Sequence, residues 1–340
     1  MLPEDRAEAL FHVYEGGGVT ATGPAFLVRK SMAERVSLSA QYYVDAVSNA
    51  SIDVVTTASK FKETRNAYGF GADLLVRDAV VSMSLERSSE PDYVADNLNV
   101  NVSQDVFAGM TTVSVGFGRG SDQVGKKDIG FFDHARHWQY RTGLTQILSP
   151  RWLASANFEV VSDEGYLGNP YRAAVEFGAF VPERMPRTRS SRAIKLRTIG
   201  EIGAPGSRTV LRADFRHFWD TWDINAQTLE FGAARYFGSQ WLADASLRWY
   251  TQTQALFFSD NAPQQNTYVT RNRQLGAFDS LGLSLKATYT FGGAAAKYGT
   301  KLSGAYEFKR FDFKNFTDLR TGQAYQHNAH VLQVFVSGSF

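Results

Sequence analysis

The sequence predicts an all-β transmembrane antiparallel barrel of about sixteen strands, formed by one domain over residues 1–340. Three observations lead to this fold class. Segments of alternating apolar and polar residues recur along the chain, short turns alternate with longer connections, and large aromatic residues stand at the ends of the segments. Strands that face lipid on one side and a polar interior on the other produce such a pattern.

The alternation is clear in the segment VSLSAQYYVD at 36–45. It places Val36, Leu38 and Tyr42 on one face of a strand, and Ser37 and Asp45 on the other, because successive side chains point to opposite sides. Similar segments lie at 79–86, 98–103, 152–160, 241–249 and 281–291. These segments therefore predict strands with one apolar face.

The connections supply the strand count and the orientation. Short turns are predicted at 31–34, 76–79, 106–109, 148–151, 204–207, 237–240 and 292–299. The strands that these turns join, with one more at each end, make sixteen, so both termini are expected on the periplasmic, short-turn side. The connections near 163–190 and 254–278 exceed the ~12 to 15 residues usual for plain loops, so we expect them to be extracellular, functional loops.

The aromatic residues favour a membrane barrel over a soluble β-sandwich, which would also show alternation. A sandwich would bury large aromatic residues in the middle of its strands, whereas a membrane barrel carries them at the two interfaces. The predicted belts are Trp152, Trp241, Phe291 and Phe340 beside the short turns, and Trp138, Trp219, Trp222 and Trp249 toward the long loops. No stretch approaches the ~18 apolar residues of a membrane helix.

Composition excludes several functions. The chain has no cysteine, which removes thiol catalysis and disulfides. Its 36 basic and 34 acidic residues give a net charge of +2 with no basic block, so no nucleic-acid partner is expected. The opening MLPEDRAEAL has neither a basic nor an apolar leader region. We therefore expect that a signal peptide is absent from this chain and was removed on export to the outer membrane.

The last residues, HVLQVFVSGSF, carry Phe340, Gly338 and Val336 at two-residue steps. This ending resembles the C-terminal signal read by the barrel assembly machinery. We therefore expect that machinery, and the lipid and lipopolysaccharide of the outer membrane, as partners.

Charged residues on the predicted inner face have two interpretations. The first is a wet, salt-bridged lumen, since charge inside a membrane normally faces water or a polar interior. The second is a ladder of cations that selects anions. This interpretation fails if nearby carboxylates neutralise the cations in pairs, and the candidates for that are Glu201, Asp214, Asp244 and Glu307. The candidate lumen residues are Lys195, Arg197, Arg212, Asp214, Arg216 and Arg248.

No residue set predicts catalysis, a metal or another cofactor. The pairs His134 and His137, and His327 and His330, lie near predicted loops and lack further ligands, so we expect ordinary polar residues there. Asp163 and Glu164 have no neighbouring base in the sequence and are expected to be solvated loop charges. The glycines at 16–18 predict a tight hairpin tip.

Several longer segments resemble the outer-membrane family catalogued as domain of unknown function 3570, from about Pro3 to Phe340. They are RAEALFHVYEGGGVTATGPAFLVRK, SIDVVTTASKFKETR, SDEGYLGNPYRAAV and RADFRHFWDTWDI. The resemblance implies a barrel without an established activity and transfers no catalytic residue. It also suggests a periplasmic redox protein or lipoprotein as a partner. Matching positions expected to be functional or to organise the lumen are Asp53, Glu63, Asp163, Glu164, Asn169, Tyr171, Arg172, Arg212, Asp214, Arg216, Trp219, Asp220 and Trp222.

These observations lead to three expected functions. The first is a channel or porin-like barrel for a small polar or anionic solute. The second is a non-catalytic scaffold that sheathes or docks a periplasmic redox partner. An outer-membrane enzyme is the third, and no spacing of Ser, His and acid residues supports it.

Overall fold

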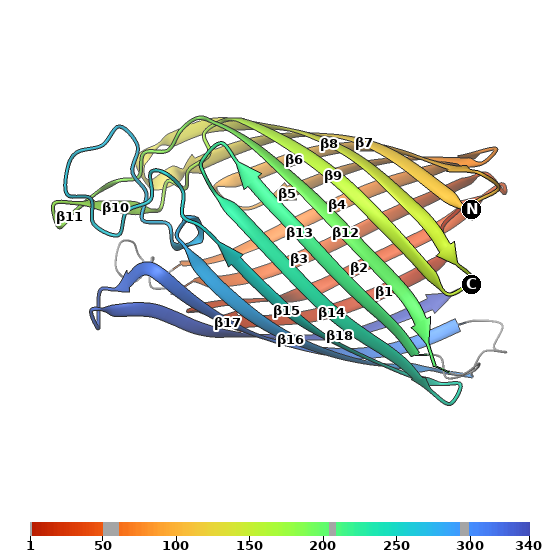
Figure 1. Cartoon of the computed structure of the whole chain (residues 1–340). Helices are drawn as coiled ribbons and strands as arrows, with labels where there is room; N and C mark the ends of the chain where they lie inside the picture. Colours follow the sequence, from red (N-terminus) through yellow and green to blue (C-terminus); the bar gives the residue numbers. More distant parts are fainter. Residues whose placement is uncertain (1, 50–60, 204–208, 293–298) are drawn as a thin grey trace.

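The computed structural model describes residues 2–49, 61–203, 209–292 and 299–340, which form a closed barrel of sixteen antiparallel strands (Figure 1). Strands that follow one another in the chain pair side by side, and β1 pairs with β18 to close the barrel. The barrel strands are β1 Arg6–Gly16, β2 Val19–Met32, β3 Val36–Asn49, β4 Phe61–Val76, β5 Ala79–Ser89, β6 Tyr93–Val106, β7 Thr111–Lys126, β8 Phe131–Ser149, β9 Trp152–Gly165, β12 Thr188–Ile202, β13 Thr209–Asp220, β14 Asn225–Phe237, β15 Trp241–Gln252, β16 Phe278–Thr290, β17 Gly299–Asp318 and β18 Gln323–Ser339. The predicted fold class is confirmed.

Two further strands, β10 Ala173–Glu176 and β11 Ala179–Pro182, form a separate hairpin between β9 and β12. Single 3₁₀ turns lie at η1 Lys127–Ile129 and η2 Arg273–Leu275. No helix within the described residues is long or apolar enough to cross a membrane.

The outer face carries the apolar residues that the alternation placed there. Phe70, Leu196 and Leu283 are 65%, 47% and 44% exposed. Inward-facing neighbours form polar contacts across the wall instead, as Arg197 does with Asp214. This apolar exterior with all strand edges paired is the arrangement that a lipid environment requires.

The two ends of the barrel differ. The chain termini lie at one end and the β10–β11 hairpin projects from the other (Figure 1). At the terminal end, short turns at 33–35, 77–78, 107–110, 150–151 and 238–240 confirm the predicted ones. The turns predicted at 204–207 and over most of 292–299 lie outside the described residues.

At the opposite end, the connections 166–187 and 253–277 are long, as predicted. Four others are tight turns where longer connections were expected, because the strands continue almost to the rim; they are 90–92, 127–130, 221–224 and 319–322. Gly17 and Gly18 form the tip of the first hairpin with φ of 57° and 81°. Positive φ at both central residues is what a tight turn of this kind needs, so the predicted hairpin tip is confirmed.

One part of the inner wall is lined by short polar side chains. Asn97, Asn99 and Asn101 of β6 lie opposite Gly120, Gly118 and Gly116 of β7. A Cβ added at any of these three glycines would lie within 3.0 Å of the facing asparagine amide oxygen. The asparagines therefore lie flat over the glycines, and this side of the interior keeps free space.

The mouth on the β13 to β18 side is filled by a hydrophobic core instead. Its buried members are Trp222, Ile224, Ala255, Phe258, Leu275, Phe313, Phe316 and Tyr325. They come from the turn 221–224, the long loop 253–277 and strands β17 and β18. The loop 253–277 thus packs onto inward-facing aromatic residues of the wall.

This core corrects one predicted belt residue. Trp222 was expected at the lipid interface but is 4% exposed, because the turn that carries it folds over the mouth. The Trp219 ring lies beside the exposed Phe158 ring on the outer face, with 6.5 Å between the two ring centroids. At the other end Trp241 and Phe340 are 51% exposed.

Candidate functional site

The two long loops join to form a roof at the barrel mouth. Arg184 and Val269 exchange two backbone hydrogen bonds of 3.0 and 2.8 Å, and the Ala262 N–H donates to the Val175 carbonyl at 2.9 Å. Ala262 and Val269 are fully buried. Backbone pairing of this kind makes the roof a defined structure, which a pair of solvated loops would not be.

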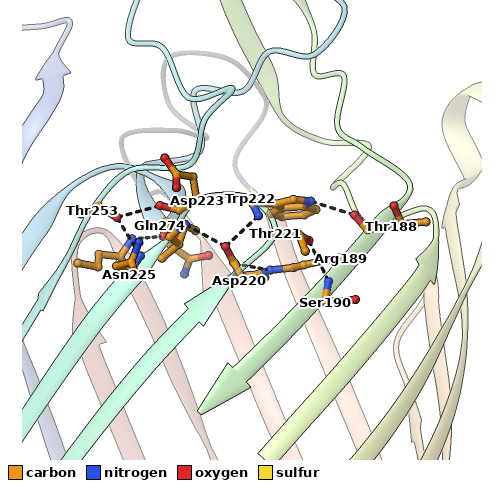
Figure 2. A network of polar contacts seen from close by, with 12 residues as sticks. Thr188, Arg189, Ser190, Asp220, Thr221, Trp222, Asp223, Asn225, Thr253 and Gln274 are labelled. Atoms are coloured by element: carbon orange, nitrogen blue, oxygen red, sulfur yellow. Dashed lines mark hydrogen bonds and ion pairs between the residues drawn. The ribbon is translucent and has the colours of Figure 1, made fainter. Parts of the chain in front are cut away.

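The turn 221–224 supports the roof through Asp220 (Figure 2). The Asp220 carboxylate is completely buried and accepts from Arg189 Nε at 2.8 Å and Nη2 at 2.6 Å. It also accepts the backbone N–H groups of Trp222 and Ile224, both at 2.9 Å. The Trp222 indole N–H donates to the Thr188 carbonyl at 3.0 Å. Asp220 therefore holds Trp222 over the interior.

Other contacts fix the roof to the wall on the opposite side. The Tyr171 hydroxyl donates to Asp92 in the β5–β6 turn, and Arg187 forms a bidentate pair with Asp133 at 2.7 and 2.9 Å. Desolvation, followed by the hydrogen bond to Asp92, raises the pKa of Tyr171. The hydroxyl therefore remains a donor at neutral pH.

Beneath the roof lies a cavity of about 540 Å³. One wall carries Asp122, His137 and Asp163 from β7, β8 and β9. Another wall carries Arg189, Arg216 and Tyr250 from β12, β13 and β15. The apolar lining comes from Leu167, Met185, Phe218, Trp222 and Leu275. A concave site of this size with a few convergent polar groups is the usual form of a small-molecule site.

The first wall is a His–carboxylate network. His137 Nδ1 lies 2.8 Å from Asp163 Oδ1, and Nε2 lies 2.8 Å from Asp122 Oδ2. Tyr93 also donates its hydroxyl to Asp122. Ionised carboxylates only accept, so the imidazolium, with two N–H groups, satisfies both. One cation between two carboxylates leaves this wall with one net negative charge.

The lumen cations divide into paired and unpaired groups. Lys195 and Arg197 share Asp214, and Arg212 forms a bidentate pair with Asp244. These pairs match the salt-bridged interpretation of the lumen. Glu307, expected to oppose these cations, pairs with Lys309.

Arg216 and Arg248 form no ion pair with any described residue. The Arg216 guanidinium lies over the Phe218 ring at 5.3 Å. Arg216 lines the cavity beside Arg189 and Tyr250.

The structure relocates two of the predicted loop charges. Asp163 and Glu164 belong to β9, not to a loop, because the strand continues to Gly165. Asp163 points inward to His137, so the expectation of a solvated charge without a neighbouring base is wrong for Asp163. Glu164 is exposed.

The remaining motif residues lie in the roof or at its edge. The Asn169 side chain accepts the Tyr171 N–H at 2.9 Å, and the Arg172 N–H donates to the Asn169 carbonyl at 3.1 Å. This turn presents Tyr171 to Asp92. Asp53 lies outside the described residues.

The C-terminal residues lie on β18 and just beyond it. Val336 and Phe340 are exposed on the outer face, and Lys30 lies 4.8 Å from the Phe340 ring. Their role in assembly stays a prediction.

Sequence reasoning missed His137, Asp122 and Tyr93 as site residues. A signal existed, since β8 and β9 pair with His137 directly opposite Asp163. To recognise this pair from the sequence one needs the register of β8 against β9, but the sequence pattern predicts loops near His137 and at Asp163. Among the described residues, no group of three His, Asp or Glu side chains has the geometry to hold a metal ion.

The fold and this interior define the class of outer-membrane β-barrels. A bacterial polysaccharide outer-membrane secretin superposes with a TM-score of 0.56 at 7% identity, covering 100% of both chains. CdiB from Acinetobacter baumannii superposes with a TM-score of 0.50 at 10% identity, covering 98% of this chain and 60% of that one. Identities this low show the fold alone. No curated protein matches the sequence.

The family model for the protein of unknown function DUF3570 matches residues 126–308, more than half of the chain. The chain therefore belongs to this family. The match is shorter than the resemblance from Pro3 to Phe340, but it includes SDEGYLGNPYRAAV and RADFRHFWDTWDI. Both segments contribute to the roof and the cavity.

Proposed function

We propose that the protein is an outer-membrane channel that passes a small polar or anionic solute without catalysing a reaction. The observation that carries this proposal is the cavity beneath the roof, which both polar and apolar side chains line, together with the inner wall where asparagines of β6 lie over glycines of β7. A second polar cavity of about 400 Å³, lined in part by Ser39, Asn101 and Arg141, extends the free space along that wall.

The charges support a preference for anions. Arg212 is balanced by Asp244, whereas Lys195 and Arg197 share the single carboxylate of Asp214. Arg216 and Arg248 form no ion pair with any described residue, and unbalanced cations in a narrow, low-dielectric passage attract anions. We therefore propose these two residues as the selectivity determinants.

Planar-bilayer recording tests the proposal. The wild-type barrel should conduct with a reversal potential that indicates an anion preference. The variants Arg216→Met and Arg248→Met should each weaken that anion preference. Arg310→Met is the matched control, because Arg310 lies on the outer face opposite the exposed Leu281. A barrel that reconstitutes fully and does not conduct would contradict the channel.

The scaffold for a periplasmic redox partner stays a prediction. It rests on the family resemblance, and no feature of the described residues favours it over the channel.

A further inference from the structure

The cavity beneath the roof has charges of opposite sign on two walls. The network of Asp122, His137 and Asp163 has one net negative charge. Arg216 supplies a positive charge and forms no ion pair with any described residue. Charge of both signs within one cavity suits a ligand that also carries both signs.

The spacing of the two walls predicts an elongated ligand. In the strand register, Asp163 of β9 lies opposite Arg189 of β12. Arg216 of β13 lies opposite Lys195, which is six residues further along β12. At ordinary strand geometry this separates the two Cα atoms by about 10 Å across the strands and about 20 Å along them. The Arg216 side chain shortens this span, because it reaches into the cavity.

Apolar side chains also line the cavity. Leu167 and Met185 come from the loop 166–187, Trp222 from the Asp220 turn and Phe218 from the wall beside Arg216. These side chains offer contact area to an apolar or aromatic group. The cavity of about 540 Å³ lies within the range of about 300–1,000 Å³ that small-molecule sites occupy.

We propose that this cavity binds a short extended zwitterion with an apolar body, the chemistry of an apolar tripeptide. The terminal carboxylate meets Arg216, the terminal ammonium meets Asp163 and Asp122, and the central side chain packs against Phe218 and Trp222. The inference deepens the proposed channel function by naming its solute class, and therefore rests on it.

Calorimetric titration of the whole barrel in detergent tests the site, with alanyl-phenylalanyl-alanine as the probe. The N-acetylated and the C-amidated forms of the same tripeptide each lack one charge. Each should bind at least about 10-fold more weakly than the zwitterion, because each loses a charge-assisted hydrogen bond. Equal binding of the acetylated form would reduce the cavity to a simple anion site and overturn the proposal.

Two variants assign the ends of the ligand. Arg216→Met should bind the free and amidated peptides equally. Asp163→Asn should bring the affinities of the free and acetylated peptides closer together, because only Asp122 still meets the ammonium. A merely structural role would weaken all three peptides together and leave both ratios unchanged. Arg141→Met is the matched control, since Arg141 faces the interior in the second cavity and should leave every ratio unchanged.

Conductance separates this inference from the channel proposal. A barrel that conducts but binds no tripeptide overturns the zwitterion site and leaves the channel. A barrel that binds the zwitterion with the predicted ratios but does not conduct supports the site and contradicts the channel.

Discussion

Removal of the Asp220 carboxylate should open the roof of the cavity. Asp220→Ala deletes the partner of Arg189 and the acceptor for the Trp222 and Ile224 N–H groups (Figure 2). The Asp220 side chain has no exposed surface, and Arg189 is 24% exposed. Loss of one partner from a buried ion pair costs about 3–5 kcal/mol.

This energy applies to local opening of the turn, because the hydrogen-bonded barrel wall is unaffected. At about 1.4 kcal/mol for each factor of ten, opening should become more than about 100-fold more frequent. Hydrogen exchange of the Trp222 and Ile224 amides in detergent measures it directly. Thermal unfolding of the barrel should change much less.

Asp96→Ala is the matched control, since Asp96 pairs with Arg87 where both side chains are more than half exposed. An exposed pair contributes only about 0–1 kcal/mol. The exchange rates of the Trp222 and Ile224 amides in Asp220→Ala are compared with those of the amides beside position 96 in Asp96→Ala. An increase no larger in the first variant than in the second would refute the role assigned to Asp220.

Three further predictions concern topology, assembly and the first hairpin. Surface labelling of intact cells should modify Ala179→Cys on the projecting hairpin and spare Ser239→Cys in a turn at the other end, and the reverse pattern would contradict the orientation. Deletion of Phe340 should lower the amount of heat-modifiable barrel in the outer membrane; unchanged assembly would show that the ending is only a strand. Gly18→Ala should destabilise the hairpin tip by about 1–2 kcal/mol, because its φ is 81°. Gly304→Ala, with no atom near its added Cβ, should be neutral in the same unfolding measurement.

The wall of the barrel was predictable because strand alternation is local. Alternation along the strand predicts that Leu196 faces outward and Arg197 inward. In the structure Leu196 is 47% exposed, and Arg197 donates a hydrogen bond to Asp214. The same alternation could not show which cations form an ion pair with a carboxylate. That depends on which carboxylate stands across the next strand, and it separates the paired Arg212 from the unpaired Arg216.

The strand ends were less predictable. Near the mouth the alternation fades, so Asp163 was assigned to a loop although β9 includes it. Its contact with His137 depends on the register of β8 against β9, which only the paired sheet defines. Trp222 was misplaced for a related reason, because its burial depends on a distant loop, 253–277, that packs onto it.

Local sequence patterns were enough to predict the class of fold, the number of strands, most lipid-facing residues and the two long connections. These properties follow from side-chain alternation and turn chemistry, which act between residues close in the chain. The folded barrel was needed to see that the two long connections pair into one roof and that Asp220 supports it. It was also needed to see that Asp122, His137, Asp163 and Arg216 line one cavity. Those contacts join residues far apart in the chain, and closure of the barrel is what brings them together.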